Sequence, residues 1–235
     1  MGRLRQGDGE PRRSSTSEGG GSGLDDVMLP PVIPIFPLPN AVLFPSVFLP
    51  LHIFEPRYRQ MVEDALNGDR LIGMVLLRQG WELEYEGRPP VYPVGCAGLM
   101  THAEPLPDGR YNIVLRGLQK FRIDGEDEGL PYRRARITTI REAGPDDQSL
   151  VRAARHRIEA LLAGAATSDA DPPVPSAMPD EELVNALAQY MELEPIEKQA
   201  LLECDGLLTR CRSLVELMEM KVLAQRQTWK SGGVH

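Results

Sequence analysis

The stretch from 32 to 56, VIPIFPLPNAVLFPSVFLPLHIFEP, has a proline every few residues between β-branched and aromatic side chains. A proline inside a helix removes a backbone N–H and clashes with the preceding turn, so a long helix is excluded here. Val, Ile and Phe favour strands, and strands tolerate proline at edges and irregular positions. We therefore predict that the folded part begins with short strands that have irregular edges.

A short amphipathic helix is predicted over 56–67, directly after these strands. Pro56 fits the first turn of a helix, and the turn sequence NGD ends the segment. Apolar residues recur at helical spacing in between: Tyr58, Met61, Val62, Ala65 and Leu66. Four further apolar stretches up to residue 140 predict strands, separated by turn sequences such as PDG at 107–109.

Helical periodicity replaces the strand pattern after about residue 145, in four apolar segments. Strands followed by helices are typical of the α+β class. The first 27 residues have almost nothing to bury, so ordering them is not compensated by a core. We predict this organisation: a disordered tail at 1–27, a strand subdomain at 28–144, a helical subdomain at 145–226 with a loop at about 164–179, and a flexible C-terminus at 227–235.

The charge balance limits the class of partner. The formal net charge is −8, and affinity for polyanions depends mainly on clustered Lys and Arg, so a general nucleic-acid binder is disfavoured. The longest apolar run, LIGMVLL, is far shorter than the roughly 20 residues that span a bilayer. The three cysteines, an odd number without framework spacing, predict free thiols in a reducing compartment. We expect a cytoplasmic protein without a membrane partner.

The sequence has no recognisable set of reactive groups. The four histidines lack metal-ligand spacing, and no C-x-x-C motif occurs. Neither a P-loop nor a G-x-S-x-G motif is present. We therefore predict a protein that is not an enzyme, with no catalytic residues, no metal site and no cofactor.

Two local features each have two interpretations. The cluster RRAR at 133–136 could contact phosphate, but Arg134 and Arg136 share a face of an extended strand, as charges that protect a sheet edge would. We favour edge protection. Trp81 and Tyr85, in GWELEYEGRPP, are either exposed interface anchors or rings that fold back on the strands. The sequence does not favour one of these over the other.

Three segments closely resemble the substrate-binding N-terminal domain of the ATP-dependent Lon protease: PIFPLPNAVLFPSVFLPLHIFEPRYRQMVEDAL, YPVGCAGLMTHAEPLPDGRYNIVLRGLQKFRI and PYRRARI. The resemblance extends from about Leu29 to Leu223 and is closest to stand-alone bacterial proteins that contain little besides this domain. It implies a PUA-like β pseudo-barrel with one packed helix, followed by a C-terminal helical bundle. Similar proteins usually have Gly after LFP, whereas this chain has Ser46, so a reshaped turn is expected there.

The resemblance implies recognition of polypeptide rather than its cleavage. Full-length Lon has an ATPase module and a Ser-Lys peptidase domain, and neither motif is found here. A peptidase S16 label would therefore rest on domain homology alone. The expected partners are unfolded or hydrophobic polypeptide segments, or a partner protein, in protein quality control. The alternative is an RNA-binding module, because PUA-like barrels also bind RNA; it would depend on Arg133, Arg134 and Arg136.

The segment 52–66, HIFEPRYRQMVEDAL, joins a predicted strand to the predicted helix. We expect Phe54 and Tyr58 to pack against the sheet, each contributing about 1.5 to 3 kcal/mol. Arg57 stays outside in this arrangement. Binding surfaces favour aromatic and Arg anchors. The predicted residues that bind the polypeptide or partner are Phe54, Arg57, Tyr58, Trp81 and Tyr85.

Overall fold

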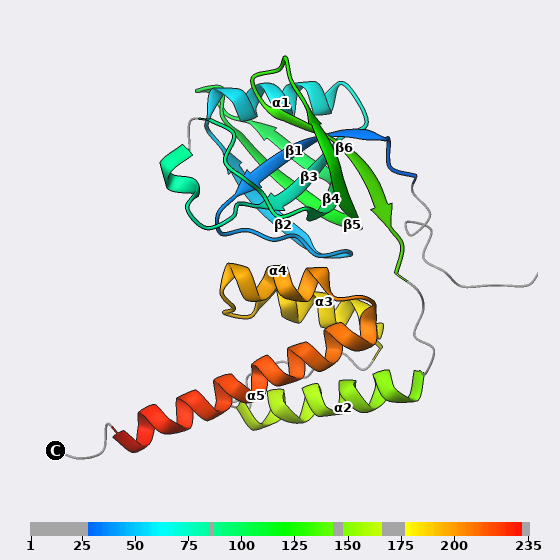
Figure 1. Ribbon diagram of the computed structural model, residues 1–235, viewed down its shortest axis with the longest axis vertical. Helices are drawn as coiled ribbons and strands as arrows, with labels where there is room; N and C mark the ends of the chain where they lie inside the picture. The colour runs from blue at the N-terminus through cyan, green and yellow to red at the C-terminus, as the bar shows by residue number, and fades with distance from the viewer. Residues whose placement is uncertain (1–27, 85–86, 143–147, 166–176, 232–235) are drawn as a thin grey trace, which may run out of the picture.

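The computed structural model describes residues 28–84, 87–142, 148–165 and 177–231 and has an α+β architecture (Figure 1). The predicted tail at 1–27 lies outside the described residues, as does most of the predicted loop at 164–179. The strands are β1 (Val32–Leu38), β2 (Phe48–Ile53), β3 (Leu71–Leu76), β4 (Val94–Pro105), β5 (Tyr111–Asp127) and β6 (Arg133–Ile140). The helices are α1 (Pro56–Leu66), α2 (Gln148–Ala165), α3 (Asp180–Tyr190), α4 (Pro195–Glu203) and α5 (Leu207–Ser231), with a 3-10 helix, η1, at Trp81–Glu84.

The six strands form one sheet in the order β2-β5-β4-β3-β1-β6, and a further pairing joins β5 to β6. This pairing closes a ring of five strands, with β2 attached to β5 outside the ring. β1 and β3 are parallel, whereas the other pairs are antiparallel. A core cluster within the sheet has residues from all five ring strands: Ile33, Ile35, Val75, Ala97, Phe121, Ala135 and Ile137.

The prediction that RRAR protects a sheet edge was wrong, because β6 pairs on both sides. Arg134 lies opposite Pro34 of β1 and opposite Asp127 of β5. The physical role of the charges is different: Arg133 and Arg136 form ion pairs with Glu126 and Asp127 of the neighbouring strand. Cross-strand pairs of opposite charge stabilise a ladder, and their partners lie too far along the sequence to be recognised in a local pattern.

The predicted helix at 56–67 is confirmed as α1, which packs on the sheet (Figure 1). Its buried residues are Tyr58, Met61, Val62 and Ala65. Pro56 occupies the first turn of α1. The backbone of Glu55, directly before it, is extended, so the chain changes from extended to helical conformation between these two residues. The ring of Tyr58 lies 4.4 Å from that of Phe36 on β1, measured between centroids.

In the turn before β2, the backbone of Ser46 is in the left-handed conformation, which serine adopts less readily than glycine. Ser46 has φ of 63°, a conformation that costs an L-residue roughly 1–2 kcal/mol. The backbone of Gly117 on β5 holds the turn in place, because Ser46 N donates to Gly117 O at 2.9 Å and Gly117 N donates to Val47 O at 2.8 Å. A Cβ at Gly117 would lie 2.0 Å from the Phe44 carbonyl oxygen. The expected reshaping of the turn was therefore wrong: close packing on Gly117 imposes the left-handed conformation on Ser46.

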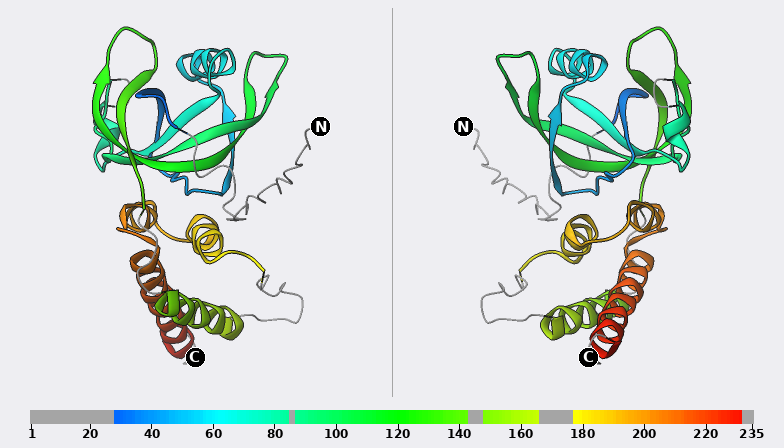
Figure 2. Two further views of the ribbon diagram at one scale, coloured as in Figure 1. Left: turned by 90° about the vertical axis from the view of Figure 1, so that its right-hand side faces the viewer. Right: turned by 90° about the vertical axis from the view of Figure 1, so that its left-hand side faces the viewer.

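The helices after the sheet lie in two layers below the ring (Figures 1 and 2). α3 and α4 lie next to the strands, and α2 and α5 pack against each other on the far side. Two side chains of α3 bind the turn before β2. Asn185 Nδ2 donates to Pro45 O at 3.2 Å, and Gln189 Oε1 accepts from Phe44 N at 3.2 Å. These contacts place α3 directly beside β2.

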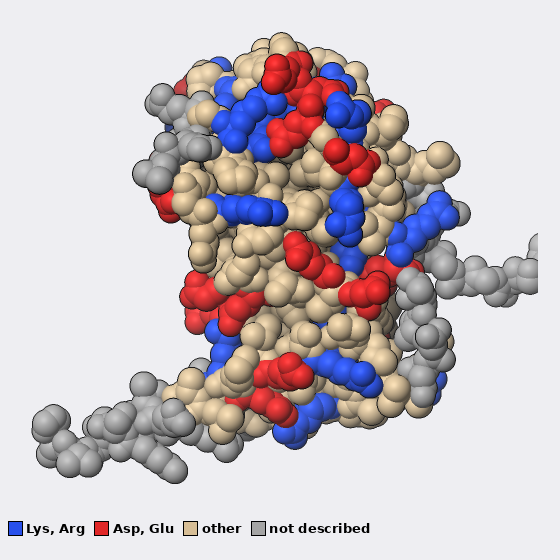
Figure 3. All heavy atoms as spheres, viewed as in Figure 1, with Lys and Arg blue, Asp and Glu red and all other residues tan. Residues whose placement is uncertain are grey.

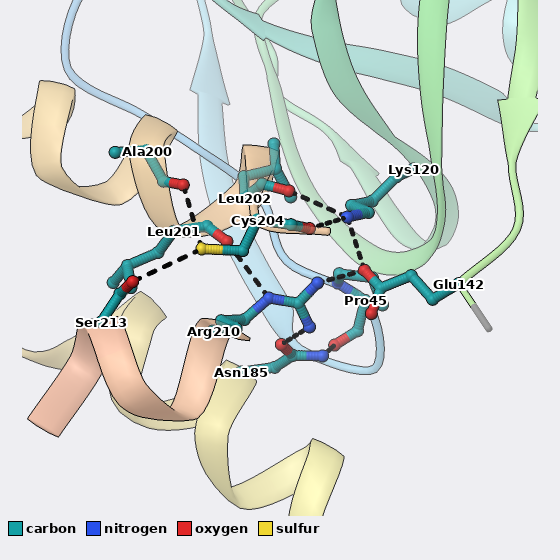
Figure 4. Close-up of polar contacts among 10 residues, drawn as sticks. All are labelled: Pro45, Lys120, Glu142, Asn185, Ala200, Leu201, Leu202, Cys204, Arg210 and Ser213. Carbon is teal, nitrogen blue, oxygen red and sulfur yellow. Dashed lines mark hydrogen bonds and ion pairs between the residues drawn. The ribbon is translucent and has the colours of Figure 1, made fainter. Parts of the chain in front are cut away.

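A buried network of charges joins the sheet to the helices (Figure 4). Arg210 of α5 is completely buried, Lys120 of β5 is nearly so, and both form ion pairs with Glu142. Arg210 Nη1 also donates to Asn185 Oδ1 at 2.9 Å. One carboxylate thus neutralises one of two buried positive charges, and the remainder must be stabilised by other groups.

Carbonyl oxygens at the end of α4 provide that stabilisation. Lys120 Nζ donates to Leu202 O at 3.1 Å and to Cys204 O at 2.9 Å, while Arg210 Nε donates to Leu201 O at 3.2 Å. The last carbonyls of a helix have no partner within the helix and carry partial negative charge. Both cations therefore bind the negative end of α4.

We expect Ser46→Gly to raise the free energy of unfolding by about 0.5 to 1 kcal/mol, because glycine adopts the left-handed conformation without the steric cost. Ser46→Val should lower it, since β-branched residues disfavour positive φ. Urea denaturation followed by circular dichroism measures both variants. If glycine and valine gave the same midpoint, the strain at this turn would be refuted.

Replacing Glu142 by Gln should lower the free energy of unfolding by about 3 kcal/mol, because two buried cations would lose their counter-charge. Glu192→Gln is the matched control: Glu192 is exposed, so its replacement should change stability by less than about 0.5 kcal/mol. Both are measured by urea denaturation. Equal stability of the two variants would contradict the role of Glu142.

Candidate functional site

The outer side of β2 presents a line of exposed residues at every second position. Phe48, Pro50, His52 and, directly after the strand, Phe54 are exposed. Successive side chains of a strand point to opposite faces, and the residues in between point towards the core: Leu49, Leu51 and Ile53. Two phenylalanine rings on the solvent side of one short strand are unusual for a surface without a binding role.

The neighbouring strands extend this surface. Directly paired residues share a face of a sheet, so three rows cross from β2 through β5 to β4. The rows are Phe48–Arg116–Leu99, Pro50–Val114–His102 and His52–Asn112–Glu104.

The third row is connected by hydrogen bonds. His52 Nδ1 lies 2.8 Å from Asn112 Oδ1, and Asn112 Nδ2 donates to Glu104 Oε2 at 3.1 Å. Glu104 therefore places a negative charge at this end of the surface.

Arg116 and Tyr190 flank the ring of Phe48 at the other end. The guanidinium carbon of Arg116 lies 5.9 Å from the centroid of the Phe48 ring, a cation–π arrangement. Tyr190, the last residue of α3, donates its hydroxyl to Phe48 O at 3.0 Å and is 66% exposed. We use the term β2 face for the surface formed by Phe48, Pro50, His52, Phe54, Arg116 and Tyr190.

Phe54 belongs to this surface and not to the core. It is 60% exposed, so the prediction that its burial stabilises the fold was wrong. The reason is the alternation of the strand: Ile53 points inward and is buried, and the next side chain points outward. Its ring is stacked on His52, with centroids 6.4 Å apart and an interplanar angle of 28°.

Two other predicted binding residues begin α1. Tyr58 is only 5% exposed, as its predicted packing against the sheet requires. Arg57 forms an ion pair with Glu55 at 2.9 Å and lies 4.6 Å above the Tyr58 ring. Both residues border a hollow of about 270 Å³ that is also lined by Arg88 and Leu130. Their roles in binding stay predictions.

The predicted aromatic pair in the loop after β3 is described only in part. Trp81 begins η1 and is half-buried. Tyr85 lies outside the described residues. Both remain predicted contact residues, and their side chains are not part of the β2 face as defined above.

The basic cluster at 133–136 offers little free charge. Arg133 Nε donates to Glu126 Oε2 at 2.8 Å, and Arg136 is paired with Asp127. On the side seen in Figure 3, acidic and basic side chains are interspersed. The structure therefore gives the RNA-binding alternative no support.

The described residues contain no group of three or more His, Cys, Asp or Glu side chains that could hold a metal ion. All three cysteines are free, as predicted. Burial raises the pKa of Cys96 to about 12 and that of Cys211 to about 11, so both thiols stay protonated near neutral pH. A protonated, buried thiol is a poor nucleophile. Among the described helices, none is both long and apolar enough to cross a membrane.

The comparison with protein families decides the family. The model of the ATP-dependent protease La (LON) substrate-binding domain matches residues 32–220. The chain belongs to the Lon substrate-binding domain family. The resemblance seen in the sequence is thereby confirmed.

Relatives of this Lon substrate-binding domain include complete Lon proteases. The chain is 26% identical to the Lon protease of Cytophaga hutchinsonii over 212 residues, and 29% identical to Lon protease 2 of Myxococcus xanthus over 203 residues. The matches cover 85% and 82% of this chain, but only 25% and 24% of the relatives. The chain thus spans about a quarter of the length of these proteases, and no catalytic domain is evident in the match.

Solved structures show the same fold. A Lon N-terminal domain protein from Xanthomonas campestris matches with a TM-score of 0.54 and 21% identity, covering 79% of this chain and 97% of that structure. The N-terminal domain of Lon protease from the Mycobacterium avium complex matches with a TM-score of 0.58 and 16% identity, covering 80% and 98%. At such identities the likeness concerns the fold alone.

Sequence reasoning found one of the six residues of the β2 face, Phe54, and missed the other five: Phe48, Pro50, His52, Arg116 and Tyr190. One signal was present, because FLPLHIF has a large or cyclic side chain at every second position from Phe48 to Phe54. No sequence pattern could have brought Arg116 and Tyr190 beside Phe48, since these contacts depend on the pairing of β5 and on the docking of α3.

The different burial of the two aromatic residues around the β2–α1 junction predicts different effects on stability. Tyr58→Ala should lower the free energy of unfolding by about 3 to 5 kcal/mol, because a buried ring is replaced by a cavity. Phe54→Ala should change it by less than about 1 kcal/mol, since the ring is largely in solvent. Thermal and urea denaturation measure both. A large loss with Phe54→Ala would contradict its assignment to the surface.

Proposed function

We propose that this Lon substrate-binding domain is a non-catalytic module that binds exposed polypeptide segments on the β2 face. The observation that carries the proposal is that three rings are exposed on the β2 face: Phe48 of β2, Phe54 directly after β2, and Tyr190 of α3. Exposed aromatic side chains beside an arginine are the usual anchors of protein interfaces. The family supports polypeptide as the class of partner.

The dimensions of the β2 face suit an extended segment. Phe48 and Phe54 are six residues apart on an extended backbone, which corresponds to roughly 20 Å. A bound segment of about six residues would contact both rings. Binding that depends on rings and not on a shaped pocket tolerates many sequences, as capture of unfolded clients in protein quality control requires.

The absence of catalysis is part of the proposal. Only the substrate-binding domain of the relatives is matched, and burial raises the pKa of the Cys96 and Cys211 thiols, which makes both poor nucleophiles. We further infer a cytoplasmic protein, in keeping with its free cysteines. A purified sample incubated with casein should release no peptides beyond a buffer control.

We also infer that the closed strand ring is a PUA-like pseudo-barrel and that α2 to α5 act as a helical bundle. The support is the ring closure by β5 and β6 and the separate layers of helices. We propose subdomains at 28–144 and 145–226, supported by the change from strands to helices between β6 and α2, although α5 itself continues to Ser231. The buried network around Glu142 then acts as the link between the two parts.

The other predicted contact residues are not part of the β2 face as defined above. Arg57, Tyr58, Trp81 and Tyr85 are proposed as secondary contacts for longer clients. A double replacement of Trp81 and Tyr85 by Ala tests the second pair. Unchanged affinity in an intact fold would remove both from the binding surface.

The proposal is tested with a reduced and carboxymethylated model protein that cannot refold. Phe48→Ala with Phe54→Ala should weaken its binding at least ten-fold in fluorescence anisotropy, because two anchors are lost. The matched control is Leu150→Ala with Leu223→Ala, on α2 and α5: these leucines are 42% and 57% exposed, and Phe48 and Phe54 are 47% and 60% exposed, so two comparably exposed apolar side chains are removed elsewhere. Equal affinities of the double variant and the control would refute the β2 face as the site.

A further inference from the structure

We propose that the β2 face selects polypeptide segments in which an acidic residue lies next to apolar ones, and that Arg116 binds the carboxylate. This inference rests on the proposed function, since it names the class of segment recognised at the same site. The inference is based on the positions of the charged side chains on the face, because binding through apolar contacts alone would not require them.

Arg116 is the one arginine of the β2 face as defined above. Among the described residues of the strand subdomain, five arginines have a carboxylate partner, and Arg116 belongs to those that have none; the paired ones are Arg57, Arg88, Arg110, Arg133 and Arg136. Among the residues that the structure describes, no carboxylate lies within ion-pair distance of Arg116, and the contact seen is with the Phe48 ring. Its positive charge is therefore not neutralised by the protein itself.

The surroundings of Arg116 strengthen an ion pair formed there. The side chain is half-buried, and the Phe48 ring lies against it, so water surrounds it only in part. Partial removal of water increases the interaction between opposite charges relative to a fully exposed pair. A guanidinium also offers two parallel N–H donors that match a carboxylate.

The opposite end of the face carries the opposite charge. Glu104 lies in the row of Asn112, four residues along β5 from Arg116, which corresponds to roughly 13 Å. A carboxylate on the client is attracted at the Arg116 end and repelled at the Glu104 end. The face therefore favours one orientation of a segment that has a single acidic residue.

The backbone edge of β2 is poorly suited to strand addition, which leaves recognition to side chains. Pro50 has no N–H to donate, and Phe48 O already accepts from the hydroxyl of Tyr190. The affinity for a segment bound mainly through its backbone would depend little on the charge of its side chains. Contacts through side chains make the charge next to the apolar residues matter.

Three labelled peptides of twelve residues test the inference. They share an apolar sequence and differ at one central position, which is Glu, Gln or Lys. Fluorescence anisotropy with the full chain should show that the Glu peptide binds about five- to ten-fold more tightly than the Gln peptide, and that the Lys peptide binds most weakly. Raising the salt concentration should reduce this preference, because the pair is only partly shielded from solvent.

Variants separate this inference from the proposed function. Arg116→Gln should abolish the preference, so that the Glu and Gln peptides bind this variant with equal affinity. Arg122→Gln is the matched control, because Arg122 is an exposed arginine on the same strand outside the β2 face. Phe48→Ala with Phe54→Ala should weaken all three peptides alike. Circular dichroism confirms that each variant is folded.

Each result has a defined meaning. Equal binding of the three peptides to the unmodified chain, or a preference for Glu that survives Arg116→Gln, would overturn the charge selection while the β2 face stands. Failure of all three peptides to bind would overturn both proposals. Tighter binding of a twelve-residue oligouridylate than of the Glu peptide, lost in Arg116→Gln, would show that the arginine serves nucleic acid instead.

Discussion

The buried ion pairs of Glu142 with Arg210 and Lys120 are the interaction on which the arrangement of the two layers depends. Removing two cations and one carboxylate from water costs free energy unless other groups stabilise their charges. The structure compensates with the carbonyl oxygens that end α4, which accept from both cations. In this position of the helices, all of these charged groups have partners. A displacement of the helices from the sheet would leave buried charges unpaired.

The β2 face is a consequence of that arrangement. The network orients Asn185 through Arg210, and Asn185 in turn binds the turn before β2. Tyr190, at the end of the same helix, thereby reaches Phe48. The proposed binding surface thus adjoins a helix whose position is set by buried contacts.

Local signals predicted much of the fold. The α+β class, the helix that begins at Pro56 and the packing of Tyr58 follow from proline placement and apolar periodicity, which act between near neighbours. The errors concern contacts between distant segments. β6 was predicted as an edge, Phe54 as a core residue and the turn at Ser46 as reshaped, and each depends on a partner strand that a local pattern does not reveal. The same limit explains why Arg116 and Tyr190 were missed.

The sequence by itself determined which segments form strands and helices, which family the chain resembles, and that no recognisable catalytic motif is present. These properties depend on residue type and short spacing. Only the tertiary structure decided that the sheet closes through β5 and β6, that Arg210 and Lys120 share one carboxylate, and that Phe48 lies between Tyr190 and Arg116. Such neighbours are brought together by strand pairing and helix docking, which join residues up to 145 positions apart in the chain.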